Sequence, residues 1–165
     1  MSSLCNNAGV GFGRSISETL SANFYSQKRA AEAFLPLLDP TEGRICNIAS
    51  ASGPNYVRGL DQPMRELFTS KETTYEQLEA ELKRQAALTD YEGVAYGLSK
   101  AAVNLWTRML AKAHPNIRIN SCSPGYVLTD LTAGACAAAV AVTPPHVITA
   151  PPSRAPLRRA CPLPR

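Results

Sequence analysis

The sequence of 165 residues predicts an α/β fold in which helices cover both faces of a mostly parallel sheet. The prediction rests on two sequence patterns that alternate along the chain. Short apolar runs typical of buried strands alternate along the chain with longer segments in which apolar residues recur at helical spacing. Strands that alternate with long helices are joined by right-handed crossovers, which pair the strands in parallel. Ligands of such sheets bind beyond the carboxyl ends of the strands.

The N-terminal part of the chain predicts two strands with one long helix between them. Residues 3–6 end a short strand that runs into a glycine-bearing loop. Apolar residues recur at helical spacing over residues 17–38, and Asp39-Pro40 ends that helix. Residues 44–50 form a short apolar run of the buried-strand type.

The middle of the chain predicts a long interruption, then a second long helix and a third strand. Gly53-Pro54 marks a loop, and residues 74–88 form an amphipathic helix that faces solvent on one side. Residues 96–114 form the second long helix, and residues 117–122 form the next strand. The strand exits, where functional residues are expected, are residues 6–9, Ser50 and residues 123–125.

Composition divides the chain near residue 133. Residues 133–165 are rich in proline and alanine, contain no acidic residue and show no sustained periodicity. Such a segment buries too little apolar surface to offset its ordering entropy. We therefore predict a folded domain over residues 1–132 and a disordered tail over residues 133–165.

Composition also excludes several classes of protein. The chain is 45% hydrophobic and 18% charged, as in soluble globular proteins, and it shows neither a membrane-spanning apolar run nor a secretory signal. We expect a cytoplasmic protein. The net charge of +4 comes from arginines of the tail, and the body lacks the basic, aromatic-lined patch that nucleic-acid binding needs.

The cysteines and histidines suggest neither a metal site nor a disulfide framework. The 5 cysteines are scattered and odd in number, and the only histidines are His114 and His146. We expect free thiols and no bound metal.

Tyr96 and Lys100 form a pattern that carries chemistry. Their spacing of four residues places the phenol and the ammonium on one face of a helix. A tyrosine titrates near a pKa of about 10, and a fixed cation nearby lowers that value toward the range of proton transfer at neutral pH. A surface pair without function is the alternative for this motif taken alone.

Further motifs accompany this pair in a fixed order. Residues 6–9 read N-N-A-G, Asn23 lies in the helix that follows, residues 47–50 read N-I-A-S, and residues 124–129 read P-G-Y-V-L-T. With these motifs, residues 4–132 resemble the short-chain dehydrogenase/reductase family. The resemblance implies a Rossmann-like, doubly wound parallel sheet and an oxidoreductase that uses a nicotinamide cofactor.

The resemblance implies a role for each catalytic position. Ser50 would donate a hydrogen bond to the substrate carbonyl oxygen, where negative charge develops. Tyr96 would give that oxygen a proton as general acid. Lys100 would lower the pKa of Tyr96 and hold the ribose hydroxyls of the cofactor, and Asn23 would fix a water that links Lys100 to solvent. The implied cofactor-binding residues are Asn6, Ala8, Gly9, Tyr96, Lys100, Pro124, Gly125, Val127 and Thr129.

The long segment between Ser50 and Tyr96 is similar to the insertion of the carbonyl reductase branch of that family. This similarity implies a monomer that uses NADPH (NADP+) to reduce small aldehydes, ketones or quinones. NADH stays open as an alternative cofactor.

The chain departs from the family pattern at both ends. The glycine-rich turn that grips the cofactor phosphates should lie some 80 residues before N-N-A-G, whereas only five residues precede Asn6. The family's last strand is not evident after residue 132. We therefore expect an incomplete sheet, and two interpretations follow: an NADPH-dependent reductase, or a truncated non-catalytic fragment or interaction module that keeps the motifs.

Overall fold

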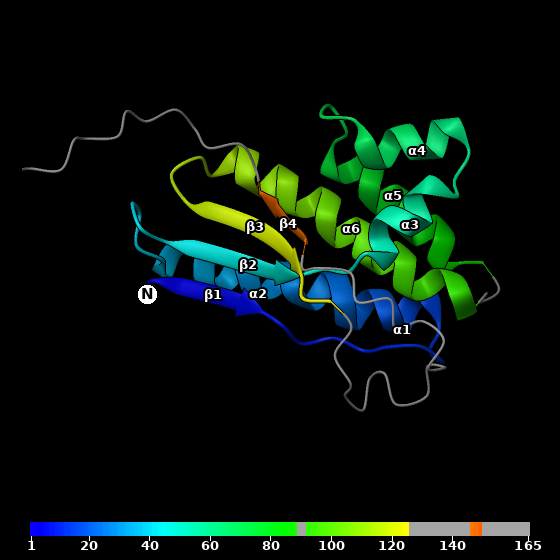
Figure 1. The fold of residues 1–165 in the computed structure, drawn as a ribbon, viewed down its shortest axis with the longest axis horizontal. Coiled ribbons are helices and arrows are strands. Elements are labelled where there is room, and N and C mark those ends of the chain that lie inside the picture. Colours follow the sequence, from blue (N-terminus) through cyan, green and yellow to red (C-terminus); the bar gives the residue numbers. More distant parts are fainter. Residues whose placement is uncertain (89–91, 126–145, 150–165) are drawn as a thin grey trace, which may run out of the picture.

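A single sheet of four strands organises the fold (Figure 1). The computed structural model describes residues 1–88, 92–125 and 146–149. The sheet order is β1-β2-β3-β4, in which the first three strands are parallel and β4 is antiparallel to β3. The strands are β1 (Ser3–Asn6), β2 (Arg44–Ile48), β3 (Arg118–Ser123) and β4 (His146–Thr149). The three parallel strands lie where the sequence predicts them.

Eight helical segments of the described chain join these strands. Those between β1 and β2 are α1 (Ile16–Leu20), the π-helix η1 (Ser21–Tyr25), α2 (Ser26–Phe34) and the 3₁₀ helix η2 (Leu35–Leu37). Those between β2 and β3 are α3 (Ser52–Arg58), α4 (Gln62–Thr69), α5 (Tyr75–Ala86) and α6 (Glu92–Ala113). The predicted helix over residues 17–38 is thus one helical segment with a π-turn inside it.

The predicted loop at Gly53-Pro54 is wrong, because these residues lie inside α3. Gly53 serves close packing and not a turn. A Cβ atom on Gly53 would lie 2.8 Å from the backbone carbon of Lys100 and 2.9 Å from the backbone nitrogen of Ala101. Only a residue without a side chain lets α3 approach α6 this closely.

Side-chain caps fix where several helices begin. Ser15 accepts a hydrogen bond from the backbone N–H of Glu18, whose carboxylate accepts from the backbone of Ser15 in return. Thr74 and Gln77 form the same reciprocal capping box at the start of α5. These pairs satisfy backbone donors that have no partner within the helix, so they set the helix start.

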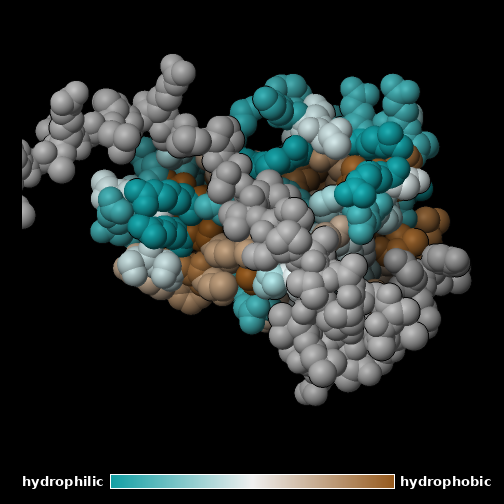
Figure 2. Space-filling view, in the orientation of Figure 1, coloured by the Kyte–Doolittle hydropathy of each residue, from teal (hydrophilic) through white to brown (hydrophobic). Residues whose placement is uncertain are grey.

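The helices that connect the parallel strands pack on one face of the sheet, with α1, α2 and α6 behind the strands in Figure 1. The sequence predicts helices on both faces. Because the spatial order of β1, β2 and β3 follows their order in the chain, successive crossovers of one hand return on the same side. Among the described residues the second face therefore carries no helix, and Figure 2 shows hydrophobic residues lying over the strands on this face.

The core lies between the sheet and the helices. Ile45 of β2 and Ile119 of β3 belong to one buried apolar cluster with Leu98 and Val103 of α6, and all four are at most 2% exposed. Phe24 is fully buried and meets the ring of Trp106 at 90°, with centroids 6.3 Å apart. This apolar layer fixes α1, η1 and α6 against the strand ends that carry the candidate site.

The segment for which we predicted disorder contains one described element. Residues 146–149 form β4, which extends the sheet beside β3. The remainder of residues 133–165 lies outside the described residues. No helix of the described chain is both long and apolar enough to cross a membrane.

Candidate active site

The residues predicted to be catalytic come together beyond the carboxyl end of β2. Ser50 lies two residues after the end of β2, Tyr96 and Lys100 lie on α6, and Asn23 lies on η1. These elements are distant in sequence, and the sheet and its two crossovers bring them together.

The side chains of Ser50 and Tyr96 are neighbours, close enough for the Ser50 hydroxyl to influence the pKa of Tyr96. The backbone N–H of Ser52 donates to Ser50 Oγ at 3.2 Å, and Ser50 Oγ donates to Ser52 Oγ at 3.2 Å. Because a serine hydroxyl rotates freely, Ser50 can turn its proton toward a third oxygen atom. The two hydroxyls are thus placed to share a ligand oxygen.

Burial raises the pKa of Tyr96, and the neighbouring Ser50 hydroxyl acts weakly in the opposite direction. The resemblance implies instead that Lys100 lowers this pKa. In the structure Lys100 Nζ lies 5.5 Å from the centroid of the Tyr96 ring, and burial of the phenol has the largest effect on the pKa of Tyr96. Tyr96 is therefore a protonated phenol at neutral pH, which suits a proton donor.

Lys100 is a buried cation, 4% exposed. Its Nζ donates to the backbone oxygen of Ile48 at 2.9 Å, and no carboxylate of the described chain forms an ion pair with it. Burial lowers the pKa of Lys100 to about 8. Since an ammonium has three donors, Lys100 keeps hydrogen-bonding capacity for the hydroxyls of a bound ribose.

Asn23 connects the loop after β1 to helix α6. Its Nδ2 donates to the backbone oxygen of Val10 at 3.0 Å and to Ser99 Oγ at 3.1 Å, and its Oδ1 accepts from the backbone N–H of Val10 at 2.7 Å. The side-chain amide is therefore occupied by the chain itself. The water-holding role implied for Asn23 stays a prediction, and the structure adds a second role, fixing the loop beside Lys100.

Asn6 points away from the strand-end site. Its Nδ2 donates to Asn47 Oδ1 at 2.8 Å, and Asn47 Nδ2 donates to Thr107 Oγ1 at 2.9 Å. Asn6 is 7% exposed on the helix-covered face of β1. Its side chain thus joins sheet to helix, so any contact of Asn6 with a cofactor would be through the backbone.

The other predicted cofactor-binding residues lie on loops at the strand ends. Ala8 and Pro124 are exposed, and Gly125 adopts a φ of 89°, which favours glycine. A Cβ atom on Gly9 would lie 3.0 Å from Asn23 Oδ1 and 3.9 Å from Lys100 Nζ. The space that Gly9 leaves open beside Asn23 and Lys100 fits the ribose end of a nicotinamide nucleotide. Val127 and Thr129 lie outside the described residues.

Several residues of the site escape sequence reasoning. Ser52 and Ser99 act through hydrogen bonds to Ser50 and Asn23, and serines of this kind carry no distinctive spacing. Phe12 packs on Tyr96 with ring centroids 5.2 Å apart, and Tyr56 lines the same small hollow. An aromatic residue after the N-N-A-G loop could have drawn notice, but only the fold brings Tyr56 there.

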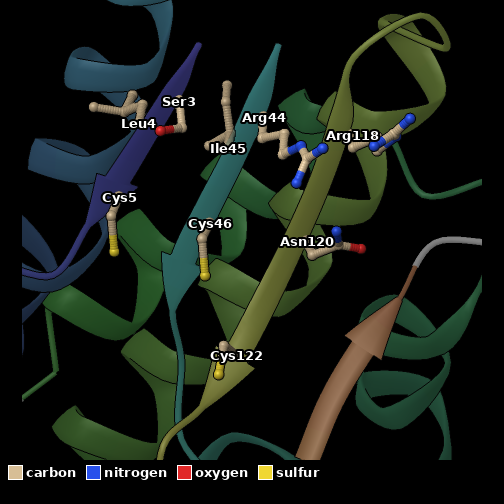
Figure 3. Close-up of a pocket in the computed structure, with 9 residues that line it drawn as sticks. All are labelled: Ser3, Leu4, Cys5, Arg44, Ile45, Cys46, Arg118, Asn120 and Cys122. Carbon is tan, nitrogen blue, oxygen red and sulfur yellow. The ribbon is translucent and has the colours of Figure 1, made fainter. Parts of the chain in front are cut away.

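A second hollow, of about 430 Å³, lies elsewhere, over the open face of the sheet (Figure 3). Its lining includes the thiols Cys5, Cys46 and Cys122, which all point to this face, and none of the candidate catalytic residues. Burial raises the pKa of Cys46 to about 11, and the neighbouring thiols add to the effect. No metal-binding group of three or more His, Cys, Asp or Glu residues occurs in the described part of the chain.

Comparison with known proteins places this geometry in a family. A family model described as enoyl-(acyl carrier protein) reductase matches residues 80–161. The (+)-neomenthol dehydrogenase of Arabidopsis thaliana is 33% identical over 126 residues, which are 69% of this chain and 42% of that relative. Carbonyl reductase (NADPH) 3 of Rattus norvegicus is 29% identical over 150 residues, which are 78% of this chain and 54% of that relative. The chain thus spans about half the length of these curated relatives.

The fold is similar to that of a solved reductase. Salutaridine reductase from Papaver somniferum superposes with a TM-score of 0.68 at 22% sequence identity, covering 79% of this chain and 61% of that chain. At this identity the likeness concerns the fold. With the sequence matches and the order of the parallel strands, it shows that the chain belongs to the short-chain dehydrogenase/reductase family.

Proposed function

We propose that this chain carries the catalytic residues of an NADPH-dependent reductase that converts a small aldehyde, ketone or quinone to an alcohol. The observation that supports it most directly is the proximity of the Ser50 and Tyr96 side chains to each other and to the buried ammonium of Lys100, whose Nζ lies 5.5 Å from the centroid of the Tyr96 ring. Two neighbouring hydroxyls can both bind one carbonyl oxygen, which is what such a reduction requires.

The site divides the chemistry among its side chains. A reduced nicotinamide, when bound, supplies the hydride to the carbonyl carbon. Ser50, held by the backbone N–H of Ser52, donates a hydrogen bond to the carbonyl oxygen as negative charge develops there. Tyr96, whose raised pKa keeps it protonated, gives that oxygen its proton.

Lys100 has two parts in this scheme. Its free donors hold the ribose hydroxyls, and its pKa of about 8 lets it exchange a proton near neutral pH and so help restore the phenol of Tyr96. The pairing of Asn23 with Val10 keeps the Gly9 loop against this ammonium. Backbone at Gly9 and Gly125 can approach a flat ligand closely because neither residue has a side chain.

The choice of NADPH is supported by the name of the rat relative, which is an NADPH carbonyl reductase. The same relative supports a small carbonyl compound as substrate. We further propose that residues 1–132 form the catalytic domain and that the protein is a cytoplasmic monomer, as the resemblance to the carbonyl reductase branch implies. Rates with NADPH and NADH measured side by side, and size-exclusion chromatography, test these points.

The reaction is tested by NADPH oxidation with menadione as the carbonyl substrate. Tyr96→Phe should lower turnover by about 10²- to 10⁴-fold, because the general acid is lost while the ring is kept. Tyr75→Phe is the matched control, since Tyr75 hydrogen-bonds Glu79 and lies outside the site. Equal rates for the Tyr96→Phe variant and the unchanged chain would refute the proposal. No turnover of the unchanged chain with either cofactor would favour the alternative, a non-catalytic interaction module.

A further inference from the structure

Beside the candidate acid lies a small hollow of about 230 Å³ with an uncharged wall. Its lining is Phe12, Ser52, Asn55, Tyr56, Tyr96 and Gly97. Three of its six lining residues are aromatic, and Ser52 and Asn55 add neutral hydrogen-bonding groups. Because no lining side chain is charged, a charged ligand would lose hydration here without gaining a partner.

Phe12 is a large apolar residue that the fold leaves exposed. It is 59% exposed, although a phenylalanine normally gains its stabilising energy from burial. Its ring lies against Tyr96 with centroids 5.2 Å apart and planes tilted by 47°. Only part of the ring is therefore covered by protein, and its free surface borders the hollow.

The opposite wall is held in place by close helix packing. A Cβ atom on Gly97 would lie 2.9 Å from Tyr56 Cβ and 3.3 Å from the backbone oxygen of Ser52. Tyr56 also meets the ring of Phe68 edge-on, with centroids 6.1 Å apart. These contacts hold Tyr56 in place on the wall of the hollow that Phe12 also lines.

The volume limits the ligand. Pockets for drug-sized molecules run from about 300 to 1,000 Å³, so a hollow of this size suits one or two rings. Aromatic rings favour offset-stacked or edge-to-face contact with another planar group. An uncharged planar ring placed here would have its substituents next to Tyr96.

We infer that Phe12 is a specificity-determining residue, and that this hollow binds the ring of an uncharged aromatic carbonyl compound whose oxygen reaches Tyr96. The inference rests on the proposed function for the reaction itself, but it makes a claim about binding that needs no turnover. Small aliphatic carbonyl compounds lack a ring to contact Phe12, so they bind without its help.

The first test measures binding by ligand-detected NMR, with benzaldehyde and propanal as probes. Phe12→Ala should weaken benzaldehyde binding by about 2- to 12-fold, the range for one aromatic contact, and leave propanal unchanged. Phe12→Tyr should restore benzaldehyde binding, whereas Phe12→Leu should not. Phe34→Ala, which removes another exposed phenylalanine on α2, is the matched control and should change neither.

The second test uses kinetics to separate this inference from the proposed function. With NADPH present, Phe12→Ala should raise KM for benzaldehyde and change kcat little. Benzaldehyde binding that depends on Phe12 without any turnover would support the hollow and refute the reductase. Turnover that is lost in Tyr96→Phe but unchanged in Phe12→Ala would support the reductase and overturn the inference about the hollow. An equal loss for benzaldehyde and propanal, or no detectable benzaldehyde binding, would overturn the inference.

Discussion

Gly53→Ala is a substitution whose effect on packing follows directly from the structure. The added Cβ would lie 2.8 Å from the backbone carbon of Lys100 and 2.9 Å from the backbone oxygen of the same residue. Both are closer than real Cβ contacts, and backbone atoms inside the long helix α6 cannot rotate away. Helix α3 must therefore move off α6, and overpacking of this kind costs about 1–3 kcal/mol of the free energy of unfolding.

The same movement reaches the candidate site. Ser52 precedes Gly53 and donates its backbone N–H to Ser50 Oγ. A shift of α3 therefore misplaces the Ser50 hydroxyl relative to Tyr96, and we expect kcat/KM to fall about tenfold or more. A purely local strain would lower stability and leave kcat/KM unchanged.

Gly59→Ala is the matched control at the end of the same helix. A Cβ there would lie 3.5 Å from the nearest heavy atom, the backbone oxygen of Tyr56, which is ordinary contact. This variant should be neutral, or more stable by up to about 1 kcal/mol through the unfolded chain. Urea unfolding gives the stability of both variants. Equal stability of the Gly53→Ala and Gly59→Ala variants would refute the packing argument.

Two further predictions concern stability. Lys100→Met should raise the free energy of unfolding at pH 7, because it removes a buried charge, although the hydrogen bond to Ile48 lost with it offsets part of the gain. In the unchanged chain the folded state releases the Lys100 proton near pH 8 and the unfolded state only near 10.5, so the Lys100 contribution to stability rises with pH across that window. Urea unfolding at pH 7 and pH 9.5 should show the Lys100→Met advantage shrinking, and an advantage constant with pH would contradict the assignment. Asn47→Ala should cost about 1–3 kcal/mol, since it removes two buried side-chain hydrogen bonds, one to Asn6 and one to Thr107. The exposed Asn116→Ala should change stability by less than about 0.5 kcal/mol. A loss for Asn47→Ala no larger than that for Asn116→Ala would show that the polar chain is unimportant.

The sequence predicted the helices and strands more reliably than it predicted how they pack against one another. The three parallel strands and helix α6 lie where apolar runs and helical spacing predict them, because both signals are local. Gly53-Pro54 was misread as a loop, since a glycine that opens space for a neighbouring helix resembles a glycine that makes a turn. The π-turn around Asn23 carries no local signal at all, because it depends on what the helix packs against.

The sequence by itself determined which groups this chain can offer: a phenol and an ammonium four residues apart on a helix, a serine after a buried strand, and glycines on loops. Only the tertiary structure decided their partners. It directed Asn6 into the sheet–helix interface, tied Asn23 to Val10 and Ser99, and placed Phe12 and Tyr56 beside Tyr96. The physical reason is that spacing along a chain fixes which residues share a face of one element. Which faces meet, and which stay open, follows from how the crossovers return across the sheet.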